Sequence, residues 1–382
     1  MKISLFILSI LLSVCVFGQE QKSGIELDFQ KLKFVDQVIL HSIEKKEIPG
    51  AVLCVVSREK LLYKKAYGNK QILPNYEKMT ENIIFDLASM TKPIATATSI
   101  MILSERGQLR LNDPVSMYVN GFKDDITIMH LLLHISGLPS YPPVEKVKEA
   151  MTNKPDALMQ YIIKNQNSKK IGKSFTYSCL NYVTLQKIVE TVSGQSLRDF
   201  AKVNIFDKLD MKNTYYAPAK QKIRNIAPTE MLNDSTILRG IVHDPLAREL
   251  QAGISGNAGL FSDADDLSKY SMMILNNGVY KGKRILSQNT VSFFTSIPEE
   301  YKEFGRTPGW DYSSIYSTCK GDFLSKNAIS HTGYTGTSIV IDQELGISII
   351  LLTNRVHPDD KGSVNRLRAL VANAVVGAVV TN

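Results

Sequence analysis

Cysteine is scarce in this sequence, with 4 residues in 382, and low-complexity tracts, internal repeats and Gly/Ser-rich linkers are absent. The scarcity of cysteine argues against a disulfide framework, and the absence of repeats argues against a solenoid or array. A hydrophobic content of 44% and a charged content of 21% are typical of globular proteins and argue against disorder. A chain of this length holds one large domain or two closely packed ones, with a sizeable core.

Sequence motifs of several other classes are also missing. No Gly-x-Ser-x-Gly elbow or phosphate-binding glycine loop occurs, which argues against an α/β-hydrolase and a nucleotide-binding protein. The net charge is +8, but the positive residues are scattered without interleaved aromatics, so nucleic acid is not an expected partner. His130 and His134 have the i, i+4 spacing of a zinc pair, yet no Glu lies between them. We interpret them as a structural pair, interpret His243-Asp244 as a structural hydrogen-bonded corner, and expect no metal and no cofactor.

The first eighteen residues, MKISLFILSILLSVCVFG, have the pattern of a removable secretion signal. One Lys precedes an apolar core, and Val16 and Gly18 are small enough for the −3 and −1 positions of a cleavage site. The apolar run 3–17 is shorter than the ~20 residues that span a bilayer, and no later segment approaches that length. We therefore expect an exported protein, periplasmic or secreted, without a transmembrane span. A lipoprotein anchored at Cys15 is the less favoured alternative, because bulky Val14 precedes it.

Strand-like patterns lie at both ends of the chain. Two short β-rich runs, 51–57 and 61–68, are separated by three charged residues and predict a hairpin. The runs 336–342 and 347–354 predict a second hairpin near the other end. Helical periodicity precedes the first hairpin, within about 25–47, and follows the second, from 364 to 380.

The middle of the chain, about 95–250, is rich in helical patterns. We predict a mixed α/β (α+β) fold, in which an antiparallel sheet from both chain ends is flanked by helices and a mainly helical region is inserted. Residues 19–382 would form a single domain, with a sheet subdomain at about 25–93 and 255–382 and a helical subdomain at about 94–254. Ser89 opens the inserted region and His331 closes it, so the two would meet in a cleft at the junction.

The pattern Ser-x-x-Lys places a hydroxyl and an amine one helical turn apart, and it occurs four times in this chain. Only Ser89-Met90-Thr91-Lys92 follows a short apolar strand-like run, IIFDLAS, and precedes a long apolar helix, 94–103. This context predicts a buried Lys92 and an accessible Ser89. A lysine in this position can take the proton of the serine if burial lowers its pKa, so the pair is a candidate nucleophile and base.

Several ordered segments surround this pair: ASMTK, ERGQLRLNDPVSMYV, ITIMHLLLHISGLPSY, FTYSCLNYVTLQKIVETVSG, IVHDPLARELQAGISGNAGLFSDADDLSKY and ISHTGYTGTSIVID. In them the chain resembles the serine β-lactamase and penicillin-binding protein superfamily. The likeness covers nearly the whole chain after the signal and points to the class C-like branch, which contains D-alanyl-D-alanine carboxypeptidases, class C β-lactamases and related esterases. The resemblance implies a β-lactamase/transpeptidase-like catalytic domain. It also implies that Ser89 is the acylated nucleophile and Lys92 its helper base.

The second motif of that superfamily, Tyr-x-Asn, maps onto Tyr177-Ser178-Cys179. The resemblance implies that the phenolic oxygen of Tyr177 shuttles a proton between nucleophile, leaving group and water. Cys179 departs from the usual Asn or Asp, and a thiol is a poor hydrogen-bonding group. The interactions that the usual Asn side chain makes with Lys92 and with the substrate are therefore weakened or made by another residue. Asn181 is the nearest candidate to replace it.

The third motif, Lys-Thr-Gly or His-Thr-Gly before an edge strand, maps onto His331-Thr332-Gly333. The resemblance implies that Thr332 offers a hydroxyl to a substrate carboxylate or carbonyl and that Gly333 lets the substrate approach the strand closely. His331 would replace a permanent cation by one that is charged only at lower pH. The backbone N–H groups of Ser89 and Tyr334 would form the oxyanion hole.

These expectations favour an exported serine hydrolase that acts through an acyl-enzyme on the D-alanyl-D-alanine ends of cell-wall peptides. Within the same mechanism, a β-lactamase and a carboxylesterase are the alternatives. An alternative of another class is a module that binds a wall fragment or penicillin without turnover, and only Cys179 favours it; a structural wall protein is a third reading. The expected partners are a small peptide, β-lactam or ester substrate and the peptidoglycan that would carry it.

Overall fold

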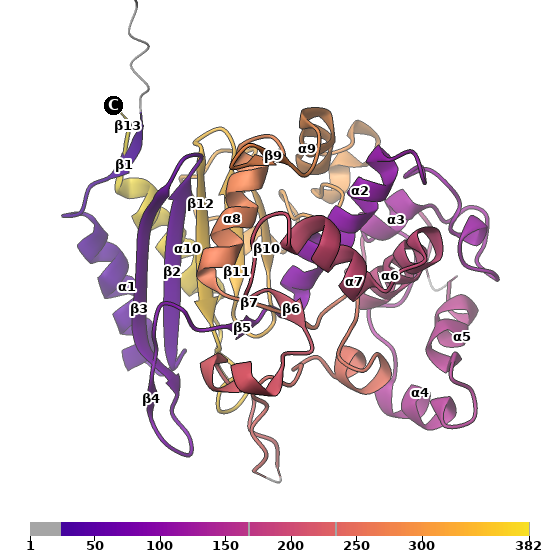
Figure 1. The fold of residues 1–382 in the computed structure, drawn as a ribbon, viewed down its shortest axis with the longest axis horizontal. Helices are drawn as coiled ribbons and strands as arrows, with labels where there is room; N and C mark the ends of the chain where they lie inside the picture. Colours follow the sequence, from indigo (N-terminus) through magenta and orange to yellow (C-terminus); the bar gives the residue numbers. More distant parts are fainter. Residues whose placement is uncertain (1–23, 167–168, 234, 382) are drawn as a thin grey trace, which may run out of the picture.

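The computed structural model describes residues 24–166, 169–233 and 235–381 (Figure 1). The predicted secretion signal, with Cys15, lies outside these residues. Within the described ranges, no helix is both long and apolar enough to cross a membrane.

The centre of the fold is a six-stranded antiparallel sheet in the order β10-β11-β12-β2-β3-β4. Its strands are β2 (Gly50–Ser57), β3 (Leu61–Gln71), β4 (Glu77–Lys78), β10 (Ile329–Thr332), β11 (Ser338–Asp342) and β12 (Ile347–Thr353). Both predicted hairpins are present, as β2–β3 and β11–β12. The pairing of β12 with β2 joins the two chain ends in one sheet, which confirms the predicted fold class.

Strand β2 is buried on both faces, because successive side chains of a strand point to opposite sides. Leu53 and Val55 face helices α1 (Leu32–Glu44) and α10 (Asn365–Gly377) and share a core with them. Val52 and Cys54 face helix α8 (Ala264–Leu275) on the other side, in the main core. The sheet therefore separates two apolar layers (Figure 1), and Cys54 is a core residue as its apolar surroundings indicate.

The predicted terminal helices are both too long. Helix α1 begins only at Leu32, and α10 ends at Gly377. The flanking residues form two short strands, β1 (Ile25–Leu27) and β13 (Val379–Thr381), which pair antiparallel with each other. Helical periodicity could not reveal this, because the backbone partner of each strand lies more than 350 residues away.

The inserted region carries most of the remaining helices. They are α2 (Thr98–Glu105), α3 (Ile128–Leu132), α4 (Val144–Met151), α5 (Ala157–Lys164), α6 (Cys179–Ser193) and α7 (Leu197–Ala201), with α9 (Gln288–Thr295) later in the chain. The predicted helix from Ile94 is not α-helical throughout. It begins within a π-helical segment, Lys92–Ala97, which continues directly into α2. The boundaries of the two subdomains remain a prediction.

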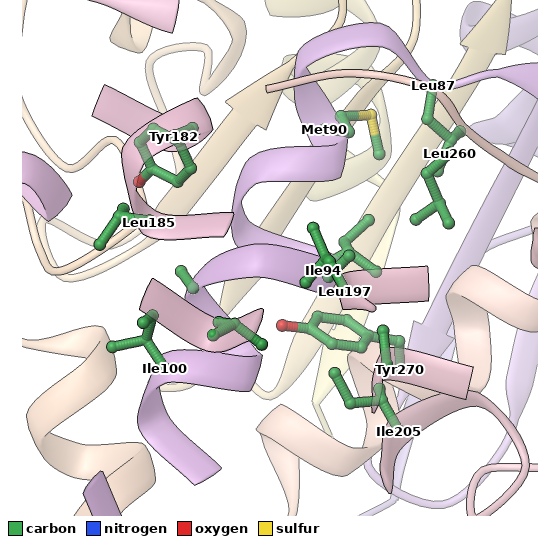
Figure 2. Packing of buried hydrophobic residues seen from close by; sticks show 14 of the residues in the cluster. Leu87, Met90, Ile94, Ile100, Tyr182, Leu185, Leu197, Ile205, Leu260 and Tyr270 are labelled. Carbon is green, nitrogen blue, oxygen red and sulfur yellow. The ribbon is translucent and has the colours of Figure 1, made fainter. Parts of the chain in front are cut away.

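One apolar core joins the inserted helices to the sheet (Figure 2). Ile94 and Ile100 from the first helical segment pack in the same cluster as Leu185 of α6 and Leu197 of α7. Tyr270 of α8 reaches into this cluster, and its hydroxyl hydrogen-bonds with that of Thr98 at 2.8 Å. The helix that begins next to Ser89 is thus fixed on all sides, which gives the residues at its start a rigid support.

A small three-stranded sheet holds the entry to this helix. Its strands are β5 (Phe85–Asp86), β6 (Tyr215–Tyr216) and β7 (Leu260–Ser262), in the order β5-β7-β6. Leu87 continues from β5 and donates its N–H to the Leu260 carbonyl at 2.9 Å. The segment that leads to Ser89 is therefore anchored by a strand from the far side of the inserted region.

Candidate active site

Ser89 lies in a tight turn between β5 and the buried helical segment. Ala88, directly before it, has a φ of 45°, a left-handed conformation that is unfavourable for a residue with a Cβ. The buried carboxylate of Asp86 holds this turn, since its two oxygens accept the N–H groups of Ala88 at 2.9 Å and of His243 at 2.8 Å. The strained turn presents Ser89, half-buried, to a cavity. His243 contributes through its backbone, in line with the predicted hydrogen-bonded corner.

Lys92 is completely buried one turn after Ser89. Its Nζ lies 2.9 Å from Ser89 Oγ, 3.0 Å from the Asn257 carbonyl oxygen and 3.8 Å from Cys179 Sγ. These three acceptors match the three N–H donors of an ammonium group. Burial alone would lower the pKa of Lys92, but the acidic groups around it, led by Cys179 and Tyr177, outweigh burial and raise it. The condition under which Lys92 would take the serine proton, a pKa lowered by burial, is therefore not met, and Lys92 is a cation that donates to Ser89.

Tyr177 lies beside this pair and lines the same cavity as Ser89. Lys92 Nζ is 5.0 Å from the centre of the Tyr177 ring. His134 stacks on the ring of Tyr177, with 4.5 Å between the ring centroids. His134 Nδ1 also accepts the N–H of Ser178 at 3.0 Å. His134 thus orients the tyrosine, which is consistent with a structural role for that histidine.

The second motif continues into helix α6, where Cys179 and Asn181 point in different directions. Cys179 is partly exposed and lies against Lys92. Asn181 is fully buried, accepts a hydrogen bond from Ser136 Oγ at 2.6 Å and lies 3.4 Å from His134 Nδ1. Two residues correspond to about 200° around a helix, so the side chains occupy nearly opposite faces. The expectation that Asn181 replaces the missing amide is therefore wrong.

Edge strand β10 carries the third motif and is tied to the nucleophile turn. Thr335 Oγ1 donates to the Asp86 carbonyl at 2.7 Å. A Cβ on Gly333 would lie 2.4 Å from the Leu87 carbonyl oxygen and 2.2 Å from Thr337 Oγ1. The glycine at this position thus makes room for the chain that leads to Ser89, a reason that differs from the expected close approach of substrate.

His331 on β10 is buried and uncharged. Its Nδ1 lies 3.0 Å from the Thr332 carbonyl oxygen, and its Nε2 has no hydrogen-bond partner in the described part of the chain. Burial, reinforced by the positive charges of Arg306 and Lys92, holds the pKa of His331 well below its ordinary value. The expectation of a cation at mildly acidic pH is therefore wrong, and any positive charge for an anionic substrate must come from elsewhere.

One cavity of about 470 Å³ brings most of the predicted residues together. Its lining includes Ser89, Tyr177, His331, Thr332, Gly333 and Tyr334. Tyr334 is exposed, its hydroxyl donates to Asp360, and Arg355 lies 4.6 Å from its ring centroid. The role of its N–H group in an oxyanion hole remains a prediction.

Three arginines of the lining were missed from the sequence: Arg306, Arg355 and Arg368. Arg368 of α10 donates to the carbonyls of Gly333 and Thr337, both at 2.8 Å, and thereby supports the loop after β10. None of these arginines lies in a motif with distinctive spacing.

A serine that is hydrogen-bonded to a buried lysine and lines a cavity together with a tyrosine is an arrangement typical of serine hydrolases. The chain belongs to the Beta-lactamase family, whose model matches residues 35–373. This finding and the relatives below confirm the predicted superfamily.

The chain is 33% identical over 364 residues to a Bacillus subtilis (strain 168) protein named N-acetylmuramyl-L-alanine amidase, covering 86% of this chain and 82% of the relative. It is 30% identical over 365 residues to a Salmonella schwarzengrund (strain CVM19633) protein provisionally named D-alanyl-D-alanine carboxypeptidase, covering 86% and 84%. The octameric penicillin-binding protein homologue from Pyrococcus abyssi has the same fold, with a TM-score of 0.69, 24% identity, and coverage of 90% of this chain and 77% of that one.

Proposed function

We propose that this protein is an exported serine hydrolase that releases D-alanine from D-alanyl-D-alanine ends of cell-wall peptides through an acyl-enzyme on Ser89. The observation that carries the proposal is the 2.9 Å hydrogen bond between the buried Lys92 and Ser89 Oγ, beside a cavity. The name of the Salmonella relative supports the substrate. The apolar segment 1–18 supports export.

In acylation, Ser89 Oγ attacks the carbonyl carbon of the penultimate D-alanine and forms a C–O bond. Because Lys92 is already protonated, the serine proton reaches the leaving nitrogen through Tyr177, whose hydroxyl takes this proton as it passes its own to that nitrogen, while Lys92 stabilises the negative charge that develops on Oγ. The N–H groups of Ser89 and Tyr334 bind the oxyanion. The C–N bond breaks as this nitrogen is protonated, and D-alanine leaves. Water hydrolyses the ester by the same proton route.

A second candidate is hydrolysis of the amide bond between N-acetylmuramic acid and L-alanine. The observation in its favour is the name of the Bacillus relative, which shares 33% identity with this chain. The same nucleophile, proton route and oxyanion site act on either carbonyl. The two candidates therefore differ in the substrate groups on each side of the bond that is cleaved.

The test compares four substrates with the purified protein: a peptide ending in D-alanyl-D-alanine, an N-acetylmuramyl-L-alanyl peptide, p-nitrophenyl acetate and nitrocefin. Ser89→Ala is the inactive variant. Ser57→Ala is the matched control, because Ser57 also belongs to a Ser-x-x-Lys sequence but lies at the end of β2, outside the residues that line the cavity.

Release of D-alanine by the wild type and by Ser57→Ala, but not by Ser89→Ala, is the expected result. Cleavage of the muramyl amide instead would transfer the assignment to the second candidate. Turnover of the ester or the lactam alone would make the protein a carboxylesterase or a β-lactamase. Reversible binding of a fluorescent penicillin without a mass shift on Ser89 would overturn the enzyme proposal in favour of a binding module.

A further inference from the structure

The support of Lys92 is weak on the side of Cys179. The sulfur lies 3.8 Å from Nζ, and a thiol is a poor hydrogen-bond acceptor. Asn181 does not replace it, since its side-chain oxygen accepts from Ser136 instead. The Asn257 carbonyl oxygen, at 3.0 Å, is a stronger acceptor for the ammonium group. The position of Lys92 therefore depends on the segment that carries this carbonyl.

Asn257 is completely buried, and both ends of its side-chain amide are held. Its Oδ1 accepts the hydroxyl of Ser255 at 2.7 Å, and its Nδ2 donates to Asp244 Oδ1 at 3.1 Å. The same side chain interacts with the Cys179 thiol. Because the side chain and the carbonyl belong to one residue, these contacts also fix the carbonyl that accepts from Lys92.

Asp244 is fixed by hydrogen bonds to both of its carboxylate oxygens. Besides the bond from Asn257, Oδ1 accepts the N–H of Ala247 at 2.8 Å. Oδ2 accepts the hydroxyl of Tyr141 at 3.0 Å, and the Tyr141 oxygen in turn accepts the N–H of Leu246 at 2.9 Å. A carboxylate held by several donors has a defined position, so it can orient the Asn257 amide.

Asp244 also acts on Lys92 through its charge. Burial lowers the pKa of Lys92, and Cys179, Tyr177 and Asp244 raise it. Of these three kinds of acid, only a carboxyl is ordinarily ionised at neutral pH, and burial raises the pKa of the Cys179 thiol further. Asp244 is thus the member of this group that supplies a negative charge at pH 7. The other titratable groups that face Lys92 are Tyr182 and the neutral histidines His134 and His331.

We propose that Asp244 is a positioning residue that gives Lys92, through Asn257 and through its own charge, the support that an amide at position 179 would give. The inference rests on the acylation of Ser89 in the proposed function, but not on the peptide substrate. The hydrogen-bonded corner at His243-Asp244 thereby controls the orientation and the charge of the lysine.

The experiment measures the rate at which a fluorophosphonate labels Ser89, as a function of pH. Asp244→Asn is the main variant, because it removes the charge while its amide oxygen can still accept from Asn257. Asp124→Asn is the matched control. Asp124 also accepts a hydroxyl group and loses one negative charge in this variant, but it is exposed and absent from the cavity lining.

Asp244→Asn is expected to slow labelling at pH 7.5 by about tenfold, as for a weakened hydrogen bond to a charged group. Asp124→Asn should label like the wild type. The alkaline limb of the rate profile should move to lower pH by about one unit in Asp244→Asn, because Lys92 loses its proton more easily without the negative charge. An unchanged rate overturns the inference. A slower rate with an unmoved alkaline limb also overturns it, because a merely structural role predicts that result.

A double-mutant cycle with Cys179→Asn gives an independent test. This variant restores an amide at position 179, so Lys92 should depend less on Asp244. The factor by which Asp244→Asn slows labelling should therefore be smaller in Cys179→Asn than in the wild type, by about twofold or more. Equal factors in both backgrounds overturn the inference, because independent sites are additive.

The labelling assay also separates this inference from the proposed function. If Ser89 is labelled but no D-alanine is released from the peptide, the proposed function fails, and the rates of Asp244→Asn still decide the inference. Release of D-alanine at the wild-type rate by Asp244→Asn, with normal labelling, overturns the inference alone. A wild type that is not labelled at all overturns both.

Discussion

Lowering the pH from 7.5 to 5.5 is expected to destabilise the fold, because two histidines next to the nucleophile cavity are buried without charge. Burial, together with the positive charges of Arg306 and Lys92, holds the pKa values of His134 and His331 well below the ordinary 6.5. In the unfolded chain both residues would titrate near that ordinary value. The unfolded state therefore takes up protons below about pH 6.5 that the folded state does not. The contribution of each neutral histidine to the free energy of unfolding is fully present above that pH and is lost as the pH falls.

The size of the effect follows from this linkage. Between pH 7.5 and 5.5, a group that titrates near 6.5 only in the unfolded state changes the free energy of unfolding by about 1.4 kcal/mol. His134 and His331 together account for about 3 kcal/mol, a large part of the typical stability of a domain. Burial also lowers the pKa values of His130 and His357, so they add to the loss.

Urea unfolding at pH 7.5, 6.5 and 5.5 measures this loss. His331→Asn is the informative variant, because its amide can still donate to the Thr332 carbonyl but does not titrate. Between pH 7.5 and 5.5, we expect His331→Asn to lose less stability than the wild type, by about 1.4 kcal/mol. His41→Asn is the control, since the His41 side chain is 66% exposed. The reasoning is refuted if His331→Asn loses as much stability as the wild type.

Four further substitutions test the geometry around Ser89. Gly333→Ala would place a Cβ 2.4 Å from a backbone oxygen of the nucleophile turn; labelling of Ser89 by a fluorophosphonate should slow strongly, and a wild-type rate would contradict the packing argument. Asp86→Asn replaces one of two buried acceptors by a donor; the free energy of unfolding should fall by about 1–3 kcal/mol, which urea titration would detect. Lys92→Ala should slow acylation by about 10² to 10⁴, and near-normal turnover would remove the lysine from the mechanism. Cys179→Asn should retain or increase acylation, because an amide oxygen accepts from the lysine better than sulfur does; complete loss of labelling would show that the thiol has another role.

The sequence predicted those features that depend on neighbouring residues. Short runs rich in β-branched and other apolar residues located the strands that became β2, β3, β11 and β12, because such residues favour strands. The spacing of Ser89 and Lys92 predicted their contact, because three residues correspond to nearly one helical turn. The order of the family motifs also predicted the fold class, because each motif is a local pattern that the sequence alone reveals.

The tertiary structure alone decided how those residues are charged and oriented. Asn181 is adjacent to the second motif in sequence, yet it points away from the cavity because the helix turns between the two positions. The charge states of Lys92 and His331 depend on burial and on charges from distant segments, which no local pattern specifies. Arg306 has no motif of its own, and only the packing of its segment against β10 places this residue in the lining of the cavity. Local sequence patterns thus identify the residue types that take part in the chemistry. The charge states of these residues depend on contacts that form only in the folded protein.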